Sequence, residues 1–125
     1  MSYGFDALEI PANSQQEIDN GVALDFGKEL ADAGLPAGCV RAGGPIAHHR
    51  DGAAARERLE RAIHVAKALG ASVVNTTFVT PATDPNGIGA ERRGQPISQG
   101  SSRNASEYDF EITARHLKAA GQIAA

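Results

Sequence analysis

The sequence predicts an α/β protein in which parallel strands alternate with helices. Three short apolar runs are each introduced by a glycine, and helical patterns separate them. The three glycines, Gly4, Gly34 and Gly70, lie 30 and 36 residues apart, which is the length of a βα unit. Strands that alternate with helices of this length pair in parallel through right-handed crossovers, so an α/β fold is expected.

Composition limits the function classes. The chain has 125 residues, of which 42% are hydrophobic and 22% charged, as in one soluble globular domain. Fifteen acids outnumber twelve Lys and Arg, so there is no basic field for nucleic acid. Cys39 is the single cysteine and is expected to be a buried, inert thiol. No apolar run approaches the ~18 residues that span a bilayer, and the chain does not open on a secretory signal. We expect a cytoplasmic protein that binds neither membrane nor nucleic acid.

The first helical pattern lies between the first two strands. Ser14 and Glu17 have the spacing of a capping box. Gly21 and Gly27 weaken the pattern, so the helix is alternatively confined to about residues 23–33. The pattern is a ridge of four apolar residues at four-residue spacing: Ile18, Val22, Phe26 and Leu30.

Two stronger helical patterns follow. The second is expected to begin at Asp51 as N-cap and to end before Gly70, with one apolar stripe formed by Ala55, Leu59, Ala62, Ile63, Ala66 and Leu69. The third is expected to begin at Ser106, with Asp109 three residues on, and to place Phe110, Ala114 and Leu117 on one side.

Three parallel strands leave both edges of a sheet open, which is unfavourable for an independent domain. A complete (β/α)₈ barrel has eight strands and about 250 residues. A doubly wound domain has about five strands. We therefore expect residues 1–125 to be a single incomplete domain or to need a partner.

Three stretches resemble the xylose isomerase-like TIM barrels, the sugar phosphate isomerase/epimerase superfamily. "YGFDALEI" resembles the second strand of those proteins, and "ELADAGLPAGCV" resembles the next helix and third strand. "AARERLERAIHVAKALGASVVNTT" is similar to the following helix and fourth strand. The resemblance implies a partial (β/α)₈ TIM barrel with three parallel strands and three helices, which correspond to strands two to four and the helix after strand four.

The resemblance also implies a function. The family consists of enzymes that use a divalent metal (Mn, Mg, Co or Zn) and act on small sugars or related hydroxycarbonyl compounds. Its metal ligands and proton-shuttling carboxylates lie at the ends of strands five to eight. No catalytic residue or metal ligand is therefore carried over to this chain, and no metal is expected on this segment.

Strand alternation selects candidate substrate-binding residues. It directs Glu9 toward the barrel mouth, with either a substrate or a neighbouring Arg or Lys as its partner. On the next strand Cys39 and Arg41 point inward, and Arg41 is expected either to pair with Glu9 or to bind an anionic group. On the third strand the inward residues are Val73, Asn75 and Thr77, and Asn75 is suited to bind a sugar hydroxyl.

Residues 76–105 form a long segment without a hydrophobic period, which is expected to be an active-site lid or a plain surface loop. As a lid it would use Arg92 and Arg103 to bind a phosphate or carboxylate. His48 and His49 are expected to lie in a solvated loop rather than to bind a metal.

We expect a segment of a metal-dependent sugar isomerase or epimerase that acts by proton transfer next to a carbonyl. The partners would be a small sugar-like substrate and the remainder of the barrel or further copies of the chain. Two alternatives stay open, namely a non-catalytic half-barrel subunit and a small α/β module that binds anions.

Overall fold

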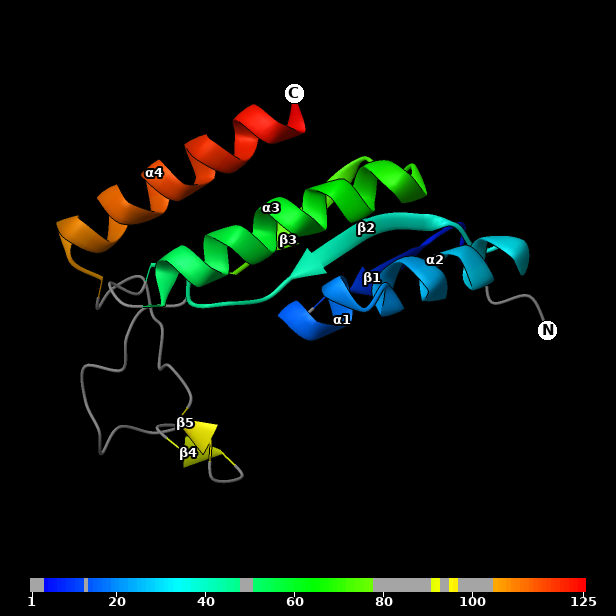
Figure 1. Ribbon diagram of the computed structural model, residues 1–125, viewed down its shortest axis with the longest axis horizontal. Helices are drawn as coiled ribbons and strands as arrows, with labels where there is room; N and C mark the ends of the chain where they lie inside the picture. The colour runs from blue at the N-terminus through cyan, green and yellow to red at the C-terminus, as the bar shows by residue number, and fades with distance from the viewer. Residues whose placement is uncertain (1–3, 13, 48–50, 78–90, 93–94, 97–104) are drawn as a thin grey trace.

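The computed structural model describes residues 4–12, 14–47, 51–77, 91–92, 95–96 and 105–125. It confirms an α/β fold with three parallel strands, and it contains four helices where three were expected (Figure 1). The elements are, in order, β1 (Leu8–Pro11), α1 (Gln15–Asp19), α2 (Val22–Asp32), β2 (Ala37–Ala42), α3 (Gly52–Leu69), β3 (Val73–Thr76), β4 (Glu91–Arg92), β5 (Gln95–Pro96) and α4 (Glu107–Ala124).

The strands lie in the order β1-β2-β3, each parallel to its neighbour. Consecutive parallel strands require right-handed crossovers, and two crossovers in the same direction place their helices on one face of the sheet. Both α2 and α3 contact β2, and α3 also packs on β3. In the part of the chain that the structure describes, the other face of the sheet carries no helix.

The first helical pattern forms two helices. Ser14 caps α1 with the expected capping box, since its Oγ accepts from the Glu17 backbone N–H at 3.1 Å. Gly21 then adopts a left-handed conformation with a φ of 75°, which ends one helix and starts the next. Gly21, which was expected to weaken the helix, is therefore the residue at which the chain turns from α1 to α2.

The predicted ridge packs against the core only in part, through the half-buried Ile18 of α1 and Leu30 of α2. Val22 and Phe26 are exposed, and the buried residues are Ala23 and Gly27. Gly27 is buried because α2 approaches α3 closely: a Cβ at this position would lie 2.5 Å from Cδ1 of Leu69. A large side chain cannot occupy this contact, so the small residues face inward and the large ones face out.

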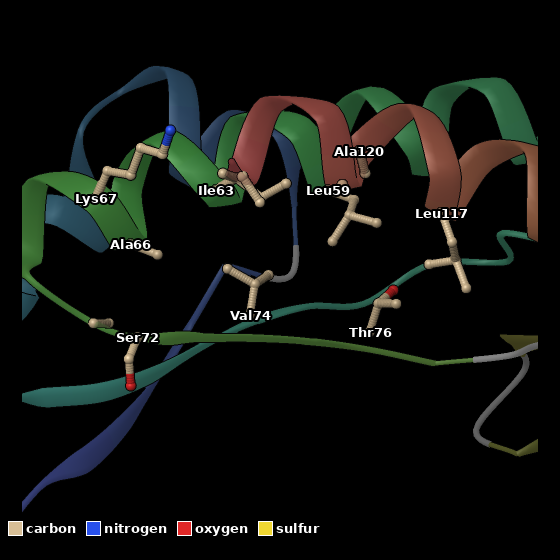
Figure 2. Close-up of a pocket in the computed structure, with 12 residues that line it drawn as sticks. Leu59, Ile63, Ala66, Lys67, Ser72, Val74, Thr76, Leu117 and Ala120 are labelled. Atoms are coloured by element: carbon tan, nitrogen blue, oxygen red, sulfur yellow. The ribbon is translucent and has the colours of Figure 1, made fainter.

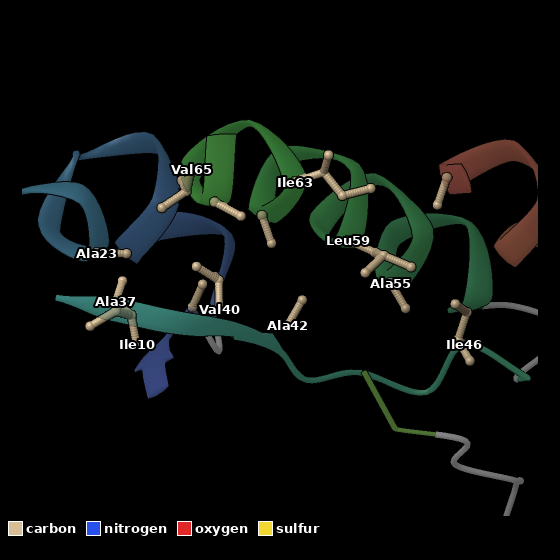
Figure 3. Close-up of a cluster of buried hydrophobic side chains, with 14 residues drawn as sticks. Ile10, Ala23, Ala37, Val40, Ala42, Ile46, Ala55, Leu59, Ile63 and Val65 are labelled. Atoms are coloured by element: carbon tan, nitrogen blue, oxygen red, sulfur yellow. The ribbon is translucent and has the colours of Figure 1, made fainter. Parts of the chain in front are cut away.

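The stripe predicted on α3 is confirmed, and it forms the centre of the core (Figure 3). Leu59 and Ile63 pack toward the sheet, where Ile10, Val40 and Ala42 lie below the helix. Gly70 ends α3 in the left-handed conformation, and Ala71 donates to the carbonyl of Ala66 at 2.9 Å. Asp51 is the N-cap residue as expected, although its side chain makes no capping hydrogen bond.

The predicted cap of α4 is confirmed, and the predicted apolar side is not the side on which the helix is buried. The Asp109 backbone N–H donates to Ser106 Oγ in a capping box. Phe110 and Leu117 are exposed, whereas Ile112, Thr113 and Ala120 are the buried residues of the helix. Of the described elements α4 contacts α3 alone, so the side that α3 covers is the buried side.

Two side-chain contacts hold α4, one at the middle of the helix and one at its C-terminal end. His116 Nδ1 lies 3.1 Å from the Ile46 carbonyl oxygen, and Lys67 Nζ on α3 donates to the Ile123 carbonyl at 2.8 Å. The remaining strands, β4 and β5, pair antiparallel with each other in a separate two-stranded sheet. Among the described helices, none combines the length and the apolar character needed to cross a bilayer.

The surroundings of Gly27 and Gly121 predict that their replacement by alanine has opposite effects on stability. Gly27→Ala should lower the free energy of unfolding by about 0.5 to 1 kcal/mol, because displacement of the half-buried Leu69 side chain outweighs the gain in helix propensity. Gly121→Ala on α4 is the control, since a Cβ there has no neighbour within 4 Å. It should raise stability by about 0.5 to 1 kcal/mol through helix propensity. Urea unfolding followed by circular dichroism measures both; equal effects would contradict the close approach of α2 to α3.

Candidate functional site

A row of polar side chains lies on the face of the sheet that has no helix. Register places Glu9 beside Cys39, and Arg41 beside Asn75 one dipeptide further along the strands. Neighbouring residues such as Ile10 and Val40 point to the opposite, helix-covered face, because side chains alternate along a strand. Three strands thus bring Glu9, Cys39, Arg41 and Asn75 together, and we call this set the polar row.

Glu9 is the centre of the polar row. Its Oε1 lies 3.5 Å from Arg41 Nε, and its Oε2 accepts from Asn75 Nδ2 at 3.4 Å. The Glu9 and Arg41 side chains are 41% and 45% exposed, so the pair stabilises the fold by no more than about 1 kcal/mol. A ligand can therefore displace these contacts at small cost.

Cys39 lies against the same carboxylate. Its Sγ is 3.7 Å from Glu9 Oε2, within reach of a weak S–H donor. Partial burial and the negative charge of Glu9 raise the pKa of the Cys39 thiol. The thiol is half-buried rather than buried, which corrects the expectation drawn from its apolar neighbours.

The structure brings some of the predicted site residues together and leaves others apart. Thr77 follows β3 and is exposed. Arg92 lies on β4, in the separate sheet, and its side chain is outside the described part of the chain. Arg103, most of the 76–105 segment and the pair His48 and His49 also lie outside the described residues.

The polar row does not fit a divalent metal. Within the described ranges, no group of three or more His, Cys, Asp or Glu side chains is placed to hold a metal ion. Glu9 and Cys39 are the ligand types in the row, and the Arg41 guanidinium beside them would repel a cation. We therefore assign the row no metal-dependent step.

A second feature, which sequence reasoning missed, is an apolar groove between α3, α4 and the edge of β3 that pairs with no described strand (Figure 2). It encloses about 270 Å³. We call it the α3–α4 groove; its lining includes Leu59, Ile63, Ala66, Val74, Leu117 and Ala120. The signal in the sequence was Leu117, which belongs to the predicted apolar side of this helix and lines the groove.

Comparison of the chain with protein families, with curated proteins and with solved structures finds no match.

The position of Glu9 predicts how Cys39 reacts. Glu9→Gln should lower the pKa of the Cys39 thiol, because it removes the charge that opposes the thiolate. At mildly alkaline pH the variant should react faster with iodoacetamide, and its pH profile should move toward lower pH. Glu111→Gln, the same change on an exposed acid of α4, is the control and should leave the profile unchanged. Identical profiles for Glu9→Gln and the parent chain would rule out the contact.

Proposed function

We propose that the chain forms one arc of a (β/α)-barrel enzyme that acts on a small sugar or related hydroxycarbonyl compound, with the polar row as part of its substrate site. One observation carries the proposal: helices cover a single face of a sequentially ordered parallel sheet, and polar side chains from all three strands gather on the other face.

The winding of the sheet fits one arc of a barrel, and it is also that of one half of a doubly wound domain, whose strand order reverses only between its halves. A doubly wound sheet has helices on both faces because its strand order reverses, whereas in a barrel every crossover lies outside. The order β1-β2-β3 contains no reversal. In such an arc the helix-free face, which bears Glu9, Arg41 and Asn75, would line the interior.

The chemistry of the polar row favours a neutral, hydroxylated ligand. A carboxylate accepts hydrogen bonds from hydroxyl groups, a guanidinium donates to them, and an amide does both. Because Glu9 balances the charge of Arg41, the row has little net attraction for a free anion. This supports a sugar or polyol over the anion-binding alternative.

The proposed reaction is isomerisation or epimerisation by proton transfer next to a carbonyl, and it rests on the resemblance to the sugar isomerase superfamily. The described residues supply orientation of the substrate: Glu9 and Asn75 hold hydroxyl groups, and Arg41 holds Glu9 in place. The proton-transferring groups would come from further strands beside the open edges of the sheet.

The proposal predicts where a sugar binds. Titration with a neutral ketose, followed by amide NMR, should shift the signals of residues 9, 39, 41 and 75. Asn75→Ala and Glu9→Gln should each weaken binding about 2- to 10-fold, as expected for one lost hydrogen bond. Gln122→Ala, on the exposed surface of α4, is the control and should bind as the parent chain does.

Two outcomes would overturn this assignment. One is the absence of ketose-induced shifts in the polar row. The other is a response to inorganic phosphate but not to the ketose, which would favour the anion-binding module instead.

A further inference from the structure

Val73 is an apolar side chain at the border of the polar row. Register places it beside Cys39, and it precedes Asn75 by two residues on β3. Val74 and Thr76 point to the opposite face of the sheet, toward the α3–α4 groove (Figure 2). Because side chains alternate along a strand, Val73 shares the helix-free face with Asn75, and it is 52% exposed there.

The Glu9 carboxylate reaches across β2 to the surroundings of Val73. Glu9 belongs to β1, yet its Oε2 lies 3.4 Å from Asn75 Nδ2 on β3 and 3.7 Å from Cys39 Sγ on β2. Both of these partners are neighbours of Val73, one along its strand and one across. A ligand hydroxyl group that binds to Glu9 and Asn75 therefore lies next to the exposed valine.

The described side chains around Val73 give a further ligand hydroxyl group no strong partner. Cys39 Sγ lies 3.7 Å from Glu9 Oε2 and also 3.7 Å from the Val40 carbonyl oxygen, so the one proton of the thiol is already engaged. A hydroxyl group placed over Val73 would give up water without gaining a comparable bond. A methyl group in the same place gives up no hydrogen bond and covers apolar surface.

The spacing of Val73 and Asn75 fits one ligand of the size of a sugar. Residues two apart on a strand are roughly 6 to 7 Å apart, so a hexose reaches over both. Val73 lies on the amino-terminal side of Asn75, whereas the reacting groups of a barrel gather at the carboxyl ends of its strands. A sugar held by Glu9 and Asn75 thus directs its carbonyl end away from Val73 and its other end toward it.

We propose that the polar row and Val73 together select a deoxy sugar, a ketose whose terminal carbon, remote from the carbonyl, is a methyl group. The polar row holds the hydroxyl groups, and Val73 packs on the methyl group and disfavours CH₂OH in its place. This inference rests on the proposed function and names the class of sugar for the same site. Val73 determines specificity in this arrangement and takes no part in the proton transfer.

Two matched sugars test the preference for a methyl group. D-fructose and its analogue with a methyl group in place of the terminal CH₂OH are each titrated into the chain, and binding is followed by amide NMR. The analogue should bind about 4- to 20-fold tighter, because its methyl group covers Val73 and no hydroxyl group is left without a partner. It should also shift the amide signal of Val73 more than fructose does.

A substitution with a matched control assigns the preference to Val73. Val73→Thr exchanges a methyl group for a hydroxyl group at nearly constant volume, and it should reduce the preference to about 1- to 3-fold. Val22→Thr, the same change at a valine of α2 that is 54% exposed, should keep the preference of the parent chain. Because the affinity ratio of the two sugars is compared between chains, differences in ring form between the sugars cancel.

Equal affinity of the parent chain for the two sugars, with shifts in the polar row from both, would overturn this inference and leave the proposed function standing. A preference that Val73→Thr leaves unchanged would have the same meaning, since another group would then recognise the methyl group. If neither sugar shifts the polar row, the proposed function fails and this inference fails with it.

Discussion

Burial of one face of the sheet beneath α3 is the interaction on which the rest of the structure depends. This helix contacts β2, β3, α1, α2 and α4, and it supplies Leu59, Ile63 and Val65 to the core. Because both crossovers lie on the same side, the sheet has one apolar face and one polar face. The core therefore determines where the polar row can lie: on the face that α3 does not cover.

The sequence predicted the elements better than it predicted their packing. Caps at Ser14 and Ser106, the end of α3 at Gly70 and the α3 stripe follow from local chemistry, and the structure confirms them. The inward faces of α2 and α4 could not be found in the same way. α2 is buried through Ala23 and Gly27, whose burial depends on how closely another helix approaches. α4 is buried through Ile112, Thr113 and Ala120, on the side that α3 covers. Hydrophobicity alone selects the larger neighbouring side chains instead.

Part of the polar row could be predicted from the sequence. Alternation along the strands places Glu9, Arg41 and Asn75 on one face, and the expected pairing of Arg41 with Glu9 is confirmed. The structure adds the contact from Asn75 to Glu9. The contact with Cys39 needs the lateral register between β1 and β2, which no local pattern encodes. Whether these residues bind a substrate, as proposed, stays a prediction. The roles expected for Arg103 and for the segment around it concern residues outside those described.

Because α3 is the one described element that α4 contacts, α4 can detach at a lower free energy than that needed to open the sheet. Among the described elements α4 contacts no strand. His116, at its middle, contacts the segment before α3, and its C-terminal end accepts a hydrogen bond from Lys67 of α3. Detachment of α4 would thus expose one side of α3 while the hydrogen bonds of the sheet stay intact. A subglobal unfolding unit of this kind exchanges its amide protons at a lower free energy than the strands do. α4 would then open as a unit while the sheet and its other helices stay folded.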